Sequence, residues 1–337
     1  MTIVLEQTDA GGISAAFLSA RKSAGSPAMG MVMTMVVVVP AAGAESAIEA
    51  AQEAAREHPS RVLTVVIGSA RGASRIDAEI RSGSGAPGET ALIRLSGEVA
   101  KHSESVVLPL LLPDSPVVVW WPTEPPADPA ADPIGRLGTR RITDAAEVST
   151  GRNRAMLTQC RSYAPGNTDL AWTRITPWRA LIAAAFDQAP GKVTGIKVTA
   201  ERVSPSAELL GAWLSDRLKV PVSWGRSDGP GITEVALATR DGEIRLARGD
   251  GRHATLSVPG QPDRPVGLRR RDVPELLHEE LRRLDPDDIY AATVRKLIKM
   301  RDTPRSTTKK SAAKKASTKN GAARKKADKK PAGRKGA

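Results

Sequence analysis

The sequence predicts an α/β (α+β) fold, with two α/β domains built on mixed sheets and a disordered basic tail. At 337 residues the chain is long enough for two ordinary domains and an extension. Aromatic residues are scarce at 3%, and Ala, Val, Leu and Ile carry the apolar content, which favours α/β layers over an all-β sandwich. Strand-like and helix-like patterns also alternate twice along the chain, once in each expected domain.

The first domain is expected at residues 29–134, after a segment at 1–28 with no assigned structure. Residues 31–39 form an apolar run rich in β-branched residues, which is typical of a strand covered on both faces. Residues 44–58 have a helical apolar pattern that Pro59 ends, and residues 61–67 are again strand-like. Strand, helix and strand in this order predict a right-handed βαβ unit.

Further strands complete the first predicted sheet. Residues 75–81 and 90–95 alternate in polarity and are joined by a glycine-rich loop, which predicts an antiparallel pair. Residues 98–112 resemble a helix that Pro109 disturbs, and residues 117–121 a short buried strand.

Residues 135–190 are expected to be a Trp- and Arg-rich connection, and residues 191–302 a second α/β domain. Ser204 and Pro205 are typical of a helix start. Asp241-Gly242 between two β-rich stretches predicts a hairpin. Asp272, with Glu275 three residues later, predicts a capping box at the start of another helix.

The net charge of +13 belongs to the end of the chain. Residues 303–337 contain ten lysines, three arginines and one aspartate, so this tail holds twelve of the thirteen net charges. It has no apolar stripe, so we expect it to be disordered. It is either a solubilising extension or a contact for polyanions without sequence specificity. The globular part has no excess charge for nucleic acid.

The single cysteine and the apolar run at 29–39 indicate the cellular compartment in which the protein is expected. Cys160 has no second thiol for an internal disulfide, although a redox role for it stays open. Arg21 and Lys22 before the apolar run imitate a signal peptide, but the acidic opening of the chain argues against one. Eleven residues are also too few to span a membrane. We therefore expect a buried strand and a cytoplasmic protein.

Sequence motifs for catalysis are missing or weak. The stretch from Gly83 to Gly88 matches the dinucleotide pattern G-x-G-x-x-G, but a strand pattern follows it where a helix is required. The four histidines lack metal-ligand spacing, and there is no nucleophile elbow. We expect a protein that is not an enzyme and has no metal or cofactor. One alternative is a sugar-phosphate or nucleotide site from Gly68 to Gly72, at the carboxyl edge of the first sheet.

Aromatic and arginine residues cluster in the middle of the chain. Six of the ten aromatics fall between Trp120 and Phe186, with arginines among them. Such residues are enriched at interface hot spots, but the tryptophans can equally belong to the core. The candidate partner-binding residues are Trp120, Trp121, Arg161, Trp172, Arg174, Trp178 and Arg179. His58 and Arg61 are candidate contacts in a loop.

Three stretches carry a family resemblance. They are residues 56–63, with the sequence REHPSRVL, residues 110–122, which contain Trp120-Trp121, and residues 169–179, which contain the run W-T-R-x-T-x-W-R. Together the chain resembles the actinobacterial OpcA family of glucose-6-phosphate dehydrogenase assembly proteins. The resemblance implies a non-enzymatic partner of that dehydrogenase, needed for its assembly or activity. The family has no agreed catalytic residues to assign.

Overall fold

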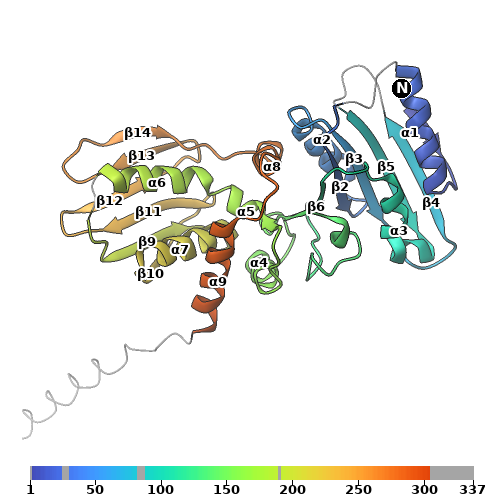
Figure 1. Ribbon diagram of the computed structural model, residues 1–337. Coiled ribbons are helices and arrows are strands. Elements are labelled where there is room, and N and C mark those ends of the chain that lie inside the picture. The colour runs from blue at the N-terminus through green and yellow to red at the C-terminus, as the bar shows by residue number, and fades with distance from the viewer. Residues whose placement is uncertain (1, 25–29, 82–87, 189–190, 304–337) are drawn as a thin grey trace, which may run out of the picture. The chain divides into compact units, whose positions relative to one another are not determined.

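The computed structural model describes residues 2–24, 30–81, 88–188 and 191–303. Residues Met1 to Met300 belong to one compact unit, which contains two mixed β-sheets (Figure 1). The predicted α/β class with two mixed sheets is confirmed. Two predicted segments lie outside the described residues. They are the glycine-rich loop, up to residue 87, and the lysine-rich tail from residue 304.

The first sheet has eight strands in the spatial order β1-β4-β5-β3-β2-β6-β7-β8. The six strands from β5 to β8 in this order are parallel, and β4 and β1 continue the sheet with antiparallel pairing. The strands are β1 Thr2–Leu5, β2 Met33–Val39, β3 Ser60–Ile67, β4 Arg75–Arg81, β5 Gly88–Ser96, β6 Val117–Trp121, β7 Arg140–Thr143 and β8 Asn167–Asp169.

The apolar run that imitates a signal peptide forms β2, in the interior of this sheet between β3 and β6. Its side chains are almost all buried because helices cover both faces. Helix α2 (Ala44–Ala54) connects β2 to the parallel strand β3. The predicted βαβ unit is therefore confirmed.

Different helices cover the two faces of the first sheet. Helices α1 (Ala10–Ala24) and α3 (Ser103–Val107) pack on one face, whereas α2 and α8 (Val273–Leu281) pack on the other (Figure 1). The expected helix at 98–112 is broken into the 3₁₀ turn η1 (Gly97–His102), α3, and the 3₁₀ turn η2 (Leu108–Leu110). Pro109 lies in η2, as its missing N–H predicts.

The second sheet has six strands in the order β10-β9-β11-β12-β13-β14. Strands β9 and β10 are parallel through helix α7 (Pro205–Leu218), and the others are antiparallel. The predicted hairpin at Asp241-Gly242 is confirmed, and Gly242 has the positive φ of 136° that glycine adopts readily. The strands are β9 Gly195–Ala200, β10 Val222–Arg226, β11 Ile232–Ala238, β12 Glu243–Ala247, β13 His253–Ser257 and β14 Arg264–Gly267.

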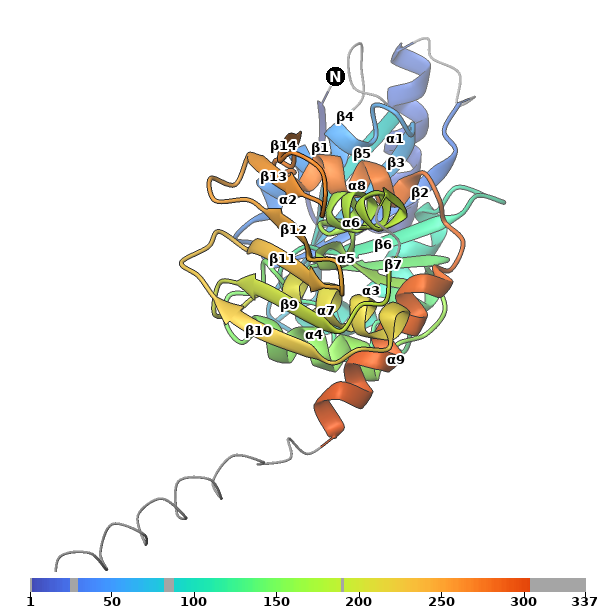
Figure 2. The same ribbon diagram turned by 90° about the vertical axis from the view of Figure 1, so that its left-hand side faces the viewer.

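Helices cover one face of the second sheet. Side chains in β12 and β13 alternate between exposed and buried, as expected for such a sheet. Helices α6 (Thr176–Gln188) and α7 lie on the same side of the strands (Figure 2). The same core includes α4 (Arg152–Arg161), α5 (Leu170–Thr173) and α9 (Asp288–Asp302).

The segment at 135–190 contributes to the first sheet and to the core of the second. It provides the 3₁₀ turn η3 (Gly135–Leu137) and strands β7 and β8 of the first sheet, as well as helices α4 to α6, which pack in the second core. Helix α8 follows the second sheet in the sequence, but it packs against α2 on one face of the first sheet. The division into domains at 134 and 190 stays a prediction about independent folding. Within the described ranges, no helix combines the length and apolar character needed to cross a bilayer.

Candidate functional site

The four candidate tryptophans lie in the interior. Trp120 and Trp121 are neighbours in β6, so their side chains enter the cores on opposite faces of the first sheet. Trp172 in α5 and Trp178 in α6 belong to the core of the second sheet. Each of the four is 2% exposed. The structure therefore favours the core interpretation, and none of these rings presents a surface to a partner in this conformation.

Trp172 is held by polar as well as apolar contacts. Its indole Nε1 donates to Asp287 Oδ2 at 2.8 Å, just before α9. The guanidinium of Arg179 lies 3.7 Å from the centre of the Trp172 ring, a cation–π contact. Tyr290 packs on the same ring with centroids 5.5 Å apart. Trp172 and Arg179 thus join α5, α6 and α9.

Two buried carboxylates lie at the ends of parallel strands, and Arg174 pairs with one of them. Its guanidinium donates to both oxygens of Asp144, after β7, at 2.6 and 2.8 Å. Asp169, at the end of β8, accepts from the Thr143 hydroxyl at 2.6 Å and the Ala145 N–H at 3.0 Å. Burial and the charge of Asp144 raise the pKa of Asp169 to about 7.

Arg161, at the end of α4, is exposed, unlike the tryptophans and Arg174. Arg154 lies seven residues earlier on the same helix and is also exposed. Cys160 is 1% exposed, and burial raises the pKa of its thiol to about 12. A protonated, buried thiol is a poor redox sensor.

His58 and Arg61, the candidate loop contacts, have structural partners. Arg61 in β3 is 6% exposed; its Nη2 donates to Glu89 at 2.7 Å, and its Nη1 donates to the Leu110 carbonyl at 2.7 Å. His58 meets the ring of His278 edge-on with centroids 5.3 Å apart. Burial and His278 lower the pKa of His58.

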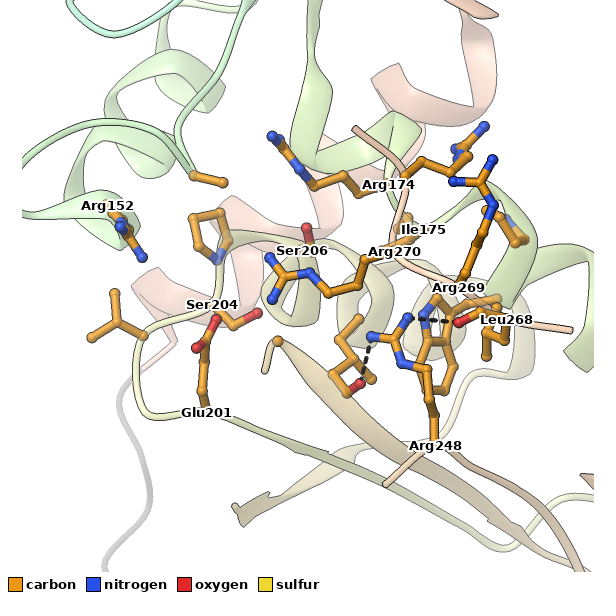
Figure 3. Close-up of a pocket in the computed structure, with 18 of the residues that line it drawn as sticks. Arg152, Arg174, Ile175, Glu201, Ser204, Ser206, Arg248, Leu268, Arg269 and Arg270 are labelled. Carbon is orange, nitrogen blue, oxygen red and sulfur yellow. Dashed lines mark hydrogen bonds between the residues drawn. The ribbon is translucent and has the colours of Figure 1, made fainter. Parts of the chain in front are cut away.

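A cavity of about 170 Å³ brings Arg174 and Trp178 together with arginines from distant parts of the chain. It lies between the loop after β7, the starts of α6 and α7, and the segment before α8 (Figure 3). Six arginines and two glutamates line it. These residues are Arg152, Arg174, Arg248, Arg269, Arg270, Arg271, Glu147 and Glu201.

The sequence reasoning missed most of this pocket. The run Arg269-Arg270-Arg271 stands directly before the capping box at Asp272, and this local signal could have drawn attention to it. Arg248 is twenty residues before Leu268 in sequence and lies beside that run through its hydrogen bond to the Leu268 carbonyl, so no local pattern identifies it. A second cavity of about 880 Å³ shares Pro177, Leu268 and the three arginines with the first.

The alternative site from Gly68 to Gly72 is an exposed loop after β3. A cavity of about 610 Å³ near it has Arg75 as its one arginine among the lining residues, and that guanidinium donates to Asp77 at 2.6 Å. Among the described residues, no three His, Cys, Asp or Glu side chains gather in a way that suits a metal ion.

Two solved structures align with the chain at low similarity. An oxidoreductase from Sinorhizobium meliloti is 11% identical with a TM-score of 0.39, covering 78% of this chain and 85% of that one. A D-galactose-1-dehydrogenase protein from Rhizobium etli is 13% identical with a TM-score of 0.37, covering 81% and 94%. Neither similarity is high enough to support an argument about function.

Sequence comparisons are more informative. A curated relative, the putative OxPP cycle protein OpcA of Synechocystis sp., is 28% identical over 158 residues, covering 44% of this chain and 32% of the relative. The aligned part therefore spans about a third of that relative's length. Residues 51–162 match the family described as the glucose-6-phosphate dehydrogenase subunit N-terminal domain, and residues 165–294 match the C-terminal domain of that subunit. The chain belongs to the OpcA family of glucose-6-phosphate dehydrogenase subunits.

Proposed function

We propose that this chain is a non-enzymatic, cytoplasmic accessory protein that binds glucose-6-phosphate dehydrogenase and promotes its assembly or activity in the oxidative pentose phosphate pathway. The observation that carries the proposal is the consecutive match to both domains of the dehydrogenase subunit family, between residues 51 and 294. The name of the Synechocystis relative, an OxPP cycle protein, supports the same pathway.

Burial changes which residues are suitable for testing the partner contact. Replacing Trp172 or Trp178 removes a buried side chain, so a weaker complex would reflect damage to the fold. Arg161 and Arg154 are exposed and lie two turns apart on α4, on one side of the helix. We therefore include this side of α4 in the proposed contact with the dehydrogenase.

The first test is co-expression with the dehydrogenase of the same source, followed by size-exclusion chromatography and an activity assay. We expect co-elution and either raised activity or a changed oligomeric state. Separate elution at micromolar concentrations, with unchanged activity, would contradict the proposed function.

The contact on α4 is tested by charge reversal. We expect the double change Arg154→Glu and Arg161→Glu to weaken the complex at least tenfold, since two positive charges become negative at the interface. The matched control is Arg240→Glu, in the exposed turn between β11 and β12. An unchanged dissociation constant in the folded double variant would place the contact elsewhere on the molecule.

A further inference from the structure

The arginines of the 170 Å³ cavity differ in how their charges are balanced. Three have a carboxylate within 4 Å: Arg174 pairs with Asp144, Arg269 with Glu275, and Arg271 with Glu279. The other three, Arg152, Arg248 and Arg270, have no such partner among the described residues. The pocket therefore holds positive charge that its own acids leave uncompensated.

Arg248 is the buried member of the unpaired group. It is 5% exposed, and its guanidinium donates to the carbonyls of Leu268 and Ile232, both at 3.0 Å (Figure 3). Its Nε–H is buried without an acceptor. Burial and the nearby charge of Arg270 lower the pKa of Arg248 to about 10. A buried cation without a counter-charge is costly, so an anion bound beside it would relieve that cost.

The start of α7 supplies polar groups on another wall. Arg270 is exposed, and Figure 3 shows its side chain pointing toward Ser204 and Ser206. The Ser204 hydroxyl accepts from the Ala207 N–H at 3.3 Å, so its own hydrogen remains to donate. The first amide groups of this 14-residue helix also favour negative charge.

The net positive charge and the number of donors together indicate the kind of anion. Glu201 also lines the cavity and has no basic partner among the described contacts, whereas Glu147 lies 3.5 Å from Arg174. Asp144 already balances Arg174, so the three unpaired arginines stand against Glu147 and Glu201 and leave one positive charge. A phosphate group brings three acceptor oxygens for the arginines, the Ser204 hydroxyl and the start of α7, whereas a carboxylate has two oxygens. Arginine also matches phosphate oxygens with two parallel donors.

The size of the cavity limits what enters it. Drug-sized ligands occupy pockets of about 300–1,000 Å³, so 170 Å³ holds a phosphate group rather than a whole nucleotide. The larger cavity of about 880 Å³ shares Arg269, Arg270 and Arg271 with this one and offers room for the remainder of an ester. We propose that the pocket binds a phosphate group, either free or as part of a small phosphorylated molecule, with Arg248 and Arg270 as its contacts.

The test uses the full chain alone, without the dehydrogenase, so its result is independent of the proposed function. Thermal melting and calorimetric titration would be carried out with inorganic phosphate and glycerol 3-phosphate, with potassium chloride at matched ionic strength. We expect saturable binding of a phosphate group and at least tenfold weaker binding by Arg270→Ala, because Arg270 is exposed and its loss leaves the fold intact. The control Arg240→Ala removes an exposed arginine outside the pocket and should bind as the wild type does.

The outcomes separate the possible ligands. Tighter binding of the ester than of inorganic phosphate would identify a phosphorylated molecule, and the reverse would identify free phosphate as the ligand; either supports the site. An equal effect of chloride, or unchanged binding by Arg270→Ala, would overturn it. Binding of a glutamate-rich peptide in place of phosphate would also overturn it, since the pocket would then serve a protein. Weaker phosphate binding by Arg248→Met would add support if that variant folds. The result for Arg270→Ala is sufficient to decide whether the site exists.

Discussion

Asp169 is a buried acid whose pKa has a consequence for stability. Its carboxylate is fully buried beside Asp144, so ionisation in the folded protein is unfavourable. The folded pKa of about 7 lies above the ordinary value of 3.8. At a pH between these two pKa values, the Asp169 carboxyl group is ionised in the unfolded chain but protonated in the native state. The contribution of Asp169 therefore lowers the free energy of unfolding as pH rises from about 4 to about 7.

We predict that this slope disappears in Asp169→Asn, which keeps the shape of the side chain but does not titrate. The difference in unfolding free energy, wild type minus variant, should fall as pH rises from 5 to 7, by at most about 1.4 kcal/mol per pH unit for one proton. Urea denaturation at each pH measures it. The lowered pKa of His58 gives a slope of opposite sign in both proteins, so the subtraction removes it. A difference that does not change with pH would show that Asp169 titrates normally.

At the scale of elements, the Arg61–Glu89 pair fixes neighbouring strands β3 and β5. Both side chains are about 95% buried, and Glu89 also lies 2.5 Å from Arg21 of α1. Arg61 reaches the Leu110 carbonyl in η2. One buried acid therefore holds two strands, a helix and a 3₁₀ turn together.

We predict that Glu89→Gln lowers the unfolding free energy by about 3–5 kcal/mol, because it leaves the Arg61 charge buried without its counter-ion. Asp77→Asn is the matched control on the adjacent strand β4. Its partner Arg75 is 43% exposed, so this change should cost under about 1 kcal/mol. Chemical denaturation compares the two variants, and equal losses would refute the assigned role of the buried pair.

At the scale of the whole molecule, the pair between Arg140 of β7 and Glu280 of α8 connects parts far apart in sequence. Arg140 also donates to the Asp285 carbonyl at 3.0 Å, and the Thr173 hydroxyl donates to Glu280 at 2.6 Å. The pair thus connects the first sheet to the helices that follow the second sheet. Because these contacts are buried, the two sheets should unfold together in the wild type.

We predict that Glu280→Gln uncouples the two sheets as well as lowering the melting temperature. The wild type should melt in a single transition, with circular dichroism and tryptophan fluorescence coinciding. The variant should show two transitions or a broadened one, since Arg140 loses its counter-ion at the connection. Glu275→Gln is the control, because glutamine keeps the capping box and the pair with Arg269 is exposed. Coincident sharp transitions in Glu280→Gln would contradict the coupling.

Local signals explain why much of the fold was predictable. The apolar run of β2, the Asp241-Gly242 turn and the capping box at Asp272 each depend on interactions within a few residues, and the structure contains all three. Strands β7 and β8 were missed because each has only three or four residues, and charged or polar side chains dominate them. Helix α1 and strand β1 lie in the segment for which no structure was assigned.

The candidate site shows the same division. The residue types around Trp172 and Arg174 indicate an important cluster. Tryptophans and arginines occur both in cores and at interfaces, however, so the sequence pattern alone does not show whether the cluster is buried or exposed. Burial was decided by long-range packing, which places Asp287 against Trp172 and Asp144 against Arg174.

By itself, then, the sequence determined the fold class, most elements and the family, because helix caps, turns and apolar periods are local properties of the chain. Only the tertiary structure decided that the four candidate tryptophans are buried, that α8 packs on one face of the first sheet, and that Arg248 and Arg270 line one pocket. The physical reason is that burial and charge pairing depend on which distant segments pack together.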